Sequence, residues 1–392
     1  MDSNRMWLLS EDFPSKGFPT FVFVEQLVFA LVDSGVNVSV IAPQSLTKAI
    51  VRGRGILCRH SVGVTKYGNH FDIYRPYRLS FGNHLKFLEP FLLYVSKKGV
   101  KRVLNKRYRE GDVLYGHFWS SCIRLLPFAA KYKAPLFVAC GEGDNAMEEM
   151  AERMSDEQKL YLRDHVTGVI SVSSENKRKS IDLGFAYEDR ITVLPNCVDD
   201  TLFYPKRNDA LKKELGINQD DFTIAFVGAF INRKGSKVLS EAIDIINQWN
   251  LKSIFIGAPL DSEDCSPTCD GIVFKGKIAH DMIPDYLACA DAFVLPTQNE
   301  GCCNAIVEAL ACGIPVISSD RPFNTDILNE HNSILIDPNS ATDIAEAIKE
   351  MMNNIETYMK YRRYAVEHAG DYSIRERARK IMEFIEKRID NK

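Results

Sequence analysis

The stretch 292–315, which reads AFVLPTQNEGCCNAIVEALACGIP, decides the fold. Its apolar start, as far as Pro296, is typical of a buried strand, and the pattern over Asn304–Cys312 is typical of a helix. A short polar loop that carries Glu300 lies between them. A buried strand that leads through a short loop into a helix favours a parallel sheet covered by helices.

The same alternation of β-branched runs and amphipathic stretches fills the rest of the chain, so the fold class is α/β. In the first half we expect a helix over Phe21–Ser34 and strands at Arg5–Ser10, Val36–Ala42, Val113–Gly116, Leu136–Ala139, Gly168–Ser173 and Thr192–Pro195. In the second half we expect strands at Thr223–Val227, Lys252–Ile256, Val273–Phe274, Ala292–Pro296, Val316–Ser318 and Ile334–Ile336. The helices expected there are Lys234–Trp249, Met282–Ala288, Asn304–Cys312, Ala341–Asn353 and a last one from Ile374 to the end.

Two domains are expected because 392 residues exceed what one hydrophobic core usually organises. Residues 196–206, bounded by Pro195 and Pro205, are expected to link them. The two α/β series therefore predict two Rossmann-like, doubly wound parallel-sheet domains. Ligands of such domains lie outside the carboxyl ends of the strands.

The formal net charge is −3, but positive charge is concentrated in residues 48–133. This segment holds 18 Lys and Arg against four Asp and Glu, and Lys97–Arg109 is its densest part. One interpretation is a solvated helix face, and another is a patch that binds an anionic membrane surface or a phosphate-bearing acceptor. Nucleic acid is disfavoured because no aromatic platform or binding motif accompanies these charges.

Other patterns narrow the class of protein. The first residues lack the basic and apolar regions of a signal peptide, and no run reaches roughly 18 apolar residues, so we expect a cytoplasmic protein without a membrane span. Ten irregularly spaced cysteines are typical of a reduced protein. Cys265 and Cys269 have no second pair nearby, so we expect no metal site.

The loop and helix of the opening stretch carry the first candidate site. Gly301 lets a ligand approach the backbone, and the free amides of the first helical turn, at Cys302, Cys303 and Asn304, suit a diphosphate. Glu308 lies about one turn further along, so its carboxylate and that of Glu300 can face the same ligand. Two carboxylates beside a phosphate site suit a nucleotide sugar, because sugar and ribose hydroxyls need acceptors for their protons.

A second candidate site follows the strand that ends at Val227. Gly228 begins a small-residue turn, and Arg233 and Lys234 stand at the start of the next helix. Two cations there can neutralise a departing nucleotide diphosphate without a metal ion.

The two motifs together, Gly228…Arg233-Lys234-Gly235 and Glu300-Gly301…Asn304…Glu308…Gly313-Ile-Pro-Val, resemble the retaining glycosyltransferases of family 4, which have the GT-B fold. Weaker similarity to the same family is carried by four stretches in the first half: Pro14–Pro19, Leu114–Phe118, Val172–Ser174 and Val193–Pro205.

The resemblance implies an N-terminal acceptor-side domain over 1–198 and a C-terminal nucleotide-sugar domain over 199–372, facing a central cleft. It also implies that a last helix, within 373–392, crosses back onto the N-terminal domain. Transfer would be retaining and would need no metal or cofactor. Arg233 and Lys234 would bind the donor diphosphate, Glu300 the transferred sugar and Glu308 the ribose, while Gly17 would approach donor phosphate or acceptor.

The sequence departs from the family pattern where a histidine that contacts the donor sugar is common. That position holds Cys140, so Glu142 and His117 are the candidates to replace it. The same segment, Gly141–Ala146, also fits a loose dinucleotide fingerprint, but it lies outside the opening βαβ unit of its domain and so does not favour a dehydrogenase.

We therefore expect a cytoplasmic hexosyl- or N-acetylhexosaminyl-transferase for polysaccharide biosynthesis. Its donor would be a nucleotide sugar, with UDP favoured, and its acceptor a glycan, free or polyprenyl-linked. Apolar residues over 87–94 beside Lys97–Arg109 would dock the enzyme on an anionic membrane surface. The alternatives are a GT-B nucleotide-sugar epimerase and a non-catalytic protein that binds nucleotide sugars.

Overall fold

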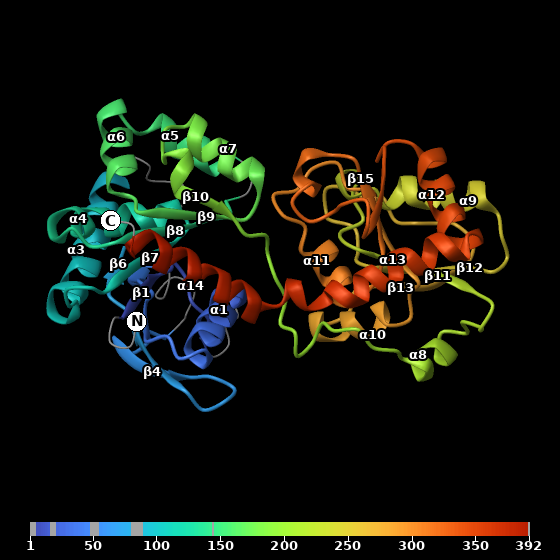
Figure 1. Ribbon diagram of the computed structural model, residues 1–392, viewed down its shortest axis with the longest axis horizontal. Coiled ribbons are helices and arrows are strands. Elements are labelled where there is room, and N and C mark those ends of the chain that lie inside the picture. The colour runs from blue at the N-terminus through green and yellow to red at the C-terminus, as the bar shows by residue number, and fades with distance from the viewer. Residues whose placement is uncertain (1–4, 16–20, 48–54, 80–88, 143–144, 391–392) are drawn as a thin grey trace. The chain divides into compact units, whose positions relative to one another are not determined.

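A computed structural model of the chain describes residues 5–15, 21–47, 55–79, 89–142 and 145–390. The chain forms two compact units, shown in Figure 1. Unit 1 comprises Met1–Leu194 together with Ala378–Lys392, and unit 2 comprises Pro195–Arg377. These limits differ by a few residues from the bounds expected at 198 and 372. The cleft expected between the two domains stays a prediction.

Unit 1 is built on an eight-stranded sheet with the strand order β10-β9-β8-β7-β1-β2-β5-β4, and a two-stranded β3-β6 sheet beside it. Its strands are β1 (Met6–Leu9), β2 (Val38–Ile41), β3 (Gln44–Ser45), β4 (His60–Val64), β5 (His70–Tyr74), β6 (Tyr77–Arg78), β7 (Val113–His117), β8 (Leu136–Cys140), β9 (Gly168–Ser171) and β10 (Ile191–Val193). Its helices are α1 (Val22–Asp33), α3 (Glu89–Arg107), α4 (Trp119–Tyr132), α5 (Ala146–Glu152), α6 (Asp156–His165) and α7 (Ser174–Asp182).

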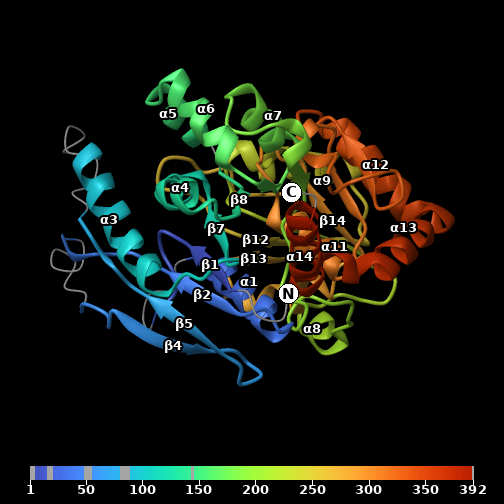
Figure 2. The ribbon, with the colours of Figure 1, turned by 60° about the vertical axis from the view of Figure 1, so that its left-hand side comes forward.

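One edge of this sheet departs from the expected parallel order. β4 and β5 form an antiparallel hairpin, which Figure 2 shows at the edge of unit 1, whereas the other strand pairs of the sheet are parallel. The side chains of β4 are alternately exposed and half-buried, so this strand lacks the continuous apolar run of the central strands. The sequence analysis missed β4 for this reason; it also missed β5, although Phe71, Ile73 and Tyr74 of that strand are buried.

Unit 2 is built on a six-stranded sheet in which every strand pair is parallel, with the order β13-β12-β11-β14-β15-β16. Its strands are β11 (Phe222–Val227), β12 (Leu251–Ile256), β13 (Ile272–Gly276), β14 (Ala292–Leu295), β15 (Val316–Ser319) and β16 (Ser333–Ile336). Its helices are α8 (Asp209–Glu214), α9 (Ser236–Ile246), α10 (Ile283–Leu287), α11 (Asn304–Ala311), α12 (Ala341–Asn353) and α13 (Ile355–His368), followed by α14 (Ile374–Asp390), which continues into unit 1.

Both large sheets reverse their winding direction at one point. In unit 2 the chain moves outward from β11 through β12 to β13, then returns to place β14 on the other side of β11. In unit 1 the corresponding reversal lies between β1 and β7. Loops that leave the carboxyl ends of such neighbouring strands diverge, and the crevice between them is where doubly wound domains bind ligands.

Each unit has its own hydrophobic core around its central strands. β1 and β14 are buried along their whole length, as the apolar runs in their sequences predict. The last part of α14 belongs to the core of unit 1, where Ala378, Ile381 and Ile385 are fully buried. Within the described ranges, no helix is both long enough and apolar enough to cross a membrane.

Candidate active site

Three charged side chains of unit 2 meet at the carboxyl ends of β11 and β14, where the sheet reverses. We call Arg233, Lys234 and Glu300 the Glu300 cluster. Lys234 Nζ lies 2.5 Å and Arg233 Nη1 3.1 Å from the same oxygen, Glu300 Oε1. The hydroxyl of Thr297 donates to this oxygen as well, at 2.8 Å. The sequence analysis predicted that these three charged residues act together, and the structure brings them together.

The two loops that carry the cluster are fastened to each other through their backbones. Gly235 has a φ of 77°, and a Cβ atom at this position would lie 2.3 Å from the carbonyl oxygen of Pro296. The amide of Gln298 donates to the carbonyl oxygen of Arg233 at 2.8 Å. Only glycine allows this close approach, so Gly235 sets the distance between the cations and the carboxylate. Gly235 also ends a 3-10 turn over Asn232–Lys234, so α9 begins at Ser236 and not at Lys234 as expected.

The start of α11 follows Glu300 directly. The first bond of the helix ladder joins the amide of Val307 to the carbonyl of Cys303, so the helix itself does not use the amides that precede Val307. A Cβ atom on Gly301 would meet no described atom within 4 Å, so the backbone here is open to a ligand. Helix amides with this orientation bind anions, which supports the predicted diphosphate position.

The side chains around the start of α11 differ in accessibility. Cys303 is buried, and burial raises the pKa of its thiol to about 12. Only its backbone is therefore expected to contact a ligand. Cys302 is half-buried, and its sulfur accepts a hydrogen bond from the amide of Asn196. Asn304 is exposed and accepts a bond from the side chain of Asn196 at 2.8 Å.

Glu308 has a different partner from the Glu300 cluster. Its carboxylate lies 2.8 Å from Nε2 of His280, a residue in the loop that follows β13. A hydrogen bond to Glu308 raises the pKa of His280, although burial of the ring opposes this shift. His280 also packs against the ring of Phe203 at 5.3 Å between centroids. Glu308 is therefore held in a fixed position at the same edge of the sheet as Glu300.

The electrostatics of the Glu300 cluster favour an anion. Two cations share one carboxylate, so the cluster carries a net positive charge. The side chains of Lys234 and Glu300 are only 17% and 13% exposed. Charges shielded from water in this way interact more strongly with a ligand than charges on an open surface. A diphosphate placed beside these cations and the amides of α11 would balance the excess charge.

The residues predicted in unit 1 lie at the carboxyl ends of β7 and β8. His117 is the last residue of β7, where it is buried against the rings of Phe23 and Phe118. Glu142 follows β8, and its carboxylate accepts bonds from the amides of Trp119 and Gly141 at 2.6 and 3.0 Å. Burial raises the pKa of Glu142, although these amides oppose the shift. Glu142 thus fixes the start of α4.

Cys140, at the position of the family histidine, points into the core of unit 1. It is fully buried, and its sulfur lies 3.5 Å from the hydroxyl of Ser180. Burial raises the pKa of its thiol to about 12. Cys140 therefore packs as a small apolar side chain and cannot make the sugar contact that the resemblance implies for a histidine at this position.

Two glycines and the basic segment are the remaining parts of the site that the sequence predicts. Gly17 lies outside the described residues. A Cβ atom on Gly228 would make ordinary contacts, with Phe226 at 3.5 Å and the side chain of Lys234 at 3.6 Å, so no described neighbour requires glycine there. On α3, Lys97 is half-buried, whereas the other basic residues of the segment are exposed: Lys98, Lys101, Arg102, Lys106, Arg107 and Arg109.

Comparison with known proteins shows what the chain is similar to. Residues 207–368 match the family model of glycosyl transferases group 1, and these residues contain the Glu300 cluster. Over these residues the chain is similar to group 1 glycosyltransferases. Its relatives include a Bacillus subtilis protein named as the teichuronic acid biosynthesis glycosyltransferase TuaC, which is 27% identical over 88% of this chain and 87% of its own. D-inositol 3-phosphate glycosyltransferase of Paenarthrobacter aurescens is 23% identical over 90% and 88%.

Solved structures confirm the predicted GT-B fold. Sucrose-phosphate synthase of Thermosynechococcus elongatus superposes with a TM-score of 0.70 over all of both chains, at 16% identity. HepE of Anabaena, solved in complex with UDP and glucose, superposes with a TM-score of 0.66 over 98% of this chain and 100% of its own, at 16% identity.

The sequence analysis missed Thr297 and His280. Both residues follow a strand closely, Thr297 after β14 and His280 after β13. A search for every polar residue just after a predicted strand would have found them, because ligands of this fold class lie at that edge of the sheet.

Proposed function

We propose that the protein is a retaining glycosyltransferase of family 4 that transfers a hexose or N-acetylhexosamine from a UDP sugar to a glycan. The observation that carries this proposal is the convergence of Arg233 and Lys234 on one oxygen of Glu300, directly before the open amides of α11. Cations and amides suit the diphosphate of the donor, and the carboxylate suits the hydroxyls of its sugar.

Leaving-group stabilisation is the main catalytic contribution in this proposal. When the bond between the sugar and the diphosphate breaks, negative charge grows on the phosphate oxygen. Lys234 and Arg233 neutralise that charge. Glu300 and Gly235 fix the positions of both cations before the donor binds. In a retaining transfer the acceptor hydroxyl attacks from the side of the departing phosphate, and a phosphate oxygen receives its proton.

Glu300 has two tasks in this scheme. Without a donor it orients both cations, and with a donor its carboxylate accepts hydrogen bonds from hydroxyls of the transferred sugar. Glu308 accepts from the ribose hydroxyls, and His280 keeps its carboxylate oriented. No metal or cofactor takes part, because the two cations and the amides of α11 supply the positive charge that the diphosphate needs.

The acceptor is a glycan used in polysaccharide biosynthesis, either free or linked to a polyprenyl carrier. The names of two relatives support this choice: TuaC of B. subtilis, named for teichuronic acid biosynthesis, and CapM of Staphylococcus aureus, named for capsular polysaccharide biosynthesis. CapM is 28% identical over 50% of this chain.

For a lipid-linked acceptor, α3 would dock the enzyme on an anionic membrane surface. This helix exposes the rings of Phe91 and Tyr94 together with five basic side chains between Lys98 and Arg107. Aromatic groups enter the interfacial region of a bilayer, and lysine and arginine attract anionic lipids. Sedimentation with anionic but not neutral vesicles is the expected result, and equal recovery with both would refute the docking.

The donor is tested by thermal unfolding in the presence of UDP, GDP and ADP sugars, because a ligand that binds the folded state raises its apparent stability. We expect UDP sugars to give the largest shift and to be slowly hydrolysed without an acceptor, with the released sugar retaining its anomeric configuration. A C2 epimer among the products would indicate an epimerase. Binding without any turnover, in the presence of candidate acceptors, would indicate a non-catalytic protein.

A further inference from the structure

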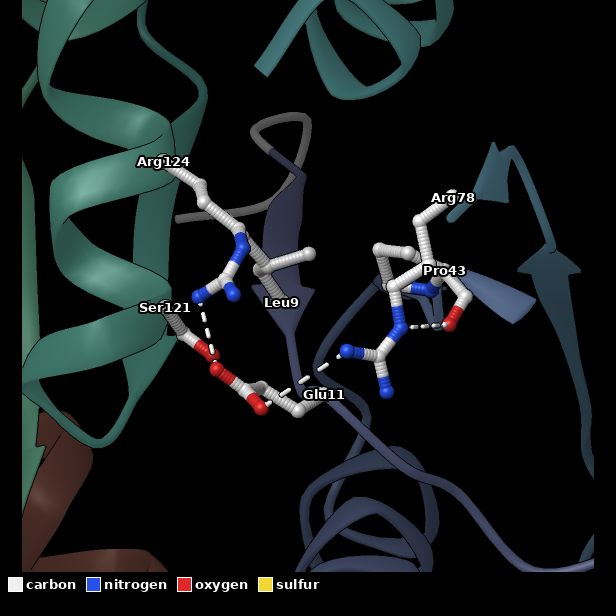
Figure 3. A pocket seen from close by; sticks show the side chains of 6 residues that line it. All are labelled: Leu9, Glu11, Pro43, Arg78, Ser121 and Arg124. Carbon is white, nitrogen blue, oxygen red and sulfur yellow. Dashed lines mark hydrogen bonds and ion pairs between the residues drawn. The ribbon is translucent and has the colours of Figure 1, made fainter. Parts of the chain in front are cut away.

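A second charged cluster lies in unit 1, far along the chain from the Glu300 cluster. We call Glu11, Arg78 and Arg124 the Glu11 cluster. Arg124 Nη1 lies 2.7 Å from Glu11 Oε1, and Arg78 Nη1 lies 4.0 Å from Glu11 Oε2. Figure 3 shows the two arginines approaching the carboxylate from opposite sides, around a small hollow that Leu9, Pro43 and Ser121 also line.

The position of this cluster in the fold is that of a ligand site. Glu11 follows β1, and Arg124 lies in the second turn of α4, which follows β7. β1 and β7 are the neighbouring strands between which the sheet of unit 1 reverses its winding direction. Doubly wound domains bind ligands at the carboxyl ends of such strands, and the Glu300 cluster occupies the corresponding place in unit 2.

The cluster has more positive than negative charge in a poorly hydrated place. The side chains of Arg78 and Arg124 are only 13% and 14% exposed. Half-buried Lys97 lies near Arg124, and burial together with the charge of Arg124 lowers its pKa. Burial alone would raise the pKa of Glu11, but Arg124 and Arg78 outweigh it and hold the pKa below its usual value. Asp12, 4.0 Å from Arg78, is half exposed.

The terminal nitrogens of Arg78 have no hydrogen-bonded carboxylate among the described residues. Its Nε donates to the carbonyl oxygen of Pro43 at 3.1 Å, whereas its Nη1 and Nη2 lie 4.0 Å from the carboxylates of Glu11 and Asp12, too far for hydrogen bonds. Arg178 on the surface of the same unit differs, because it bonds Glu175 through two nitrogens. Among the described residues, no carboxylate bonds the two terminal nitrogens of this partly buried guanidinium. These nitrogens can therefore donate to an oxyanion.

We propose that the Glu11 cluster binds an oxyanion, a phosphate or a carboxylate, carried by the acceptor sugar. This inference rests on the proposed function, which it deepens by defining the acceptor as acidic. Arg78 takes the oxyanion with the free side of its fork. As the ligand enters, the Glu11 carboxylate loses part of its contact with Arg124. The oxyanion of the ligand replaces that contact, so the buried arginines remain paired with negative charge.

The test uses the full chain with UDP at saturating concentration, so that phosphate probes cannot occupy the donor site. Calorimetric titrations compare glucose 6-phosphate, methyl glucuronide, neutral methyl glucoside and inorganic phosphate. The main variant is Arg78→Gln, and Arg178→Gln is the matched control, since it removes an arginine of the same unit that has its own carboxylate. Glu11→Gln removes the competing anion.

We expect at least one acidic sugar to bind more tightly than methyl glucoside. Arg78→Gln should weaken its binding about tenfold or more, which is the value of a charge-assisted hydrogen bond, and Arg178→Gln should leave it unchanged. Glu11→Gln should strengthen binding, a change that damage to the fold could not produce. The phosphate and carboxylate probes identify which oxyanion the acceptor carries.

Three results would overturn the inference: equal binding of acidic and neutral sugars, equal binding to Arg78→Gln and the parent protein, or binding of inorganic phosphate alone. Titration of UDP itself separates this inference from the proposed function. If UDP binds and the acidic sugars do not, only the acidic acceptor is refuted. If UDP does not bind, the proposed donor is refuted, and the Arg78 comparison is then read without UDP.

Discussion

Replacement of Glu300 by glutamine should have opposite effects on the binding of UDP and on sugar transfer. In the free protein the Glu300 carboxylate holds a charge close to both cations, 2.5 Å from Lys234 and 3.1 Å from Arg233. The diphosphate must share these cations with the carboxylate, and the two anions repel each other. Glu300→Gln removes this repulsion. It also removes the carboxylate that accepts hydrogen bonds from hydroxyls of the transferred sugar.

The size of the effect follows from the distances. Since Lys234 lies 2.5 Å from Glu300 and would lie about 2.8 Å from a bound phosphate oxygen, the two anions would be at most about 5 Å apart. At that distance two unit charges repel by roughly 1 kcal/mol in water and by about 3 kcal/mol at an effective dielectric constant of about 20. The variant should therefore bind UDP at least about fivefold more tightly.

The loss of transfer should be at least as large. A hydrogen bond from a sugar hydroxyl to a carboxylate contributes about 1.5 to 3 kcal/mol, so kcat/KM should fall about tenfold or more. Calorimetry measures the Kd for UDP, and release of UDP from a UDP sugar measures turnover. Glu350→Gln is the matched control, because Glu350 lies on α12 and bonds the side chains of Asn354 and Thr357. A folded Glu300→Gln protein with unchanged or weaker UDP binding would refute the reasoning.

Three further predictions concern the residues around this cluster. Lys234→Gln should lower both UDP affinity and kcat/KM about tenfold or more, because it removes a charge-assisted bond to the diphosphate. His280→Gln should lower the free energy of unfolding in urea at pH 5.5 but not at pH 8.5. The partner Glu308 raises the pKa of His280, so the ion pair stabilises the fold fully below about pH 6.5 and is lost as the pH rises through the raised value. Gly235→Ala should cost at least about 2 kcal/mol of unfolding free energy, because φ is 77° and the new Cβ would meet Pro296.

Two matched variants and one matched condition test these predictions. Lys237→Gln alters an exposed lysine of α9 and should leave UDP binding unchanged. Gly216→Ala places a Cβ in open space at a φ of 70°, so it isolates the cost of the backbone conformation, and an equal loss in Gly235→Ala would deny the contact with Pro296. For His280, an equal loss of stability at both pH values would argue against the ion pair, which should contribute less than about 1 kcal/mol because the ring is largely exposed.

The sequence predicted the elements that are buried along their whole length. The strand near Ala292 and the helix from Asn304 were recognisable because a central parallel strand shows a continuous apolar run and its helix shows a clear period. β4 was missed, because this edge strand has exposed side chains and carries no such run.

The candidate site was predictable only where its residues belong to recognisable motifs. Arg233, Lys234 and Glu300 stand at strand ends and in family motifs, so their convergence could be expected. The approach of Arg78 and Arg124 to Glu11 could not, because strand order alone brings these three distant segments together. The excess of Lys and Arg over residues 48–133 was visible, but a charge count does not distinguish a solvated helix face from inward-turned side chains.

The last helix of the chain has a consequence for how the protein forms during synthesis. The ring of Phe384 packs 6.1 Å from that of Phe137 on β8, and Arg388 donates to the carbonyl oxygens of Thr167 and Asp189. The first unit to emerge from the ribosome therefore lacks part of its interior until α14 has been synthesised. Unit 2 has all of its residues earlier, so we expect it to fold first, and removal of the last 15 residues should unfold unit 1 while unit 2 remains intact.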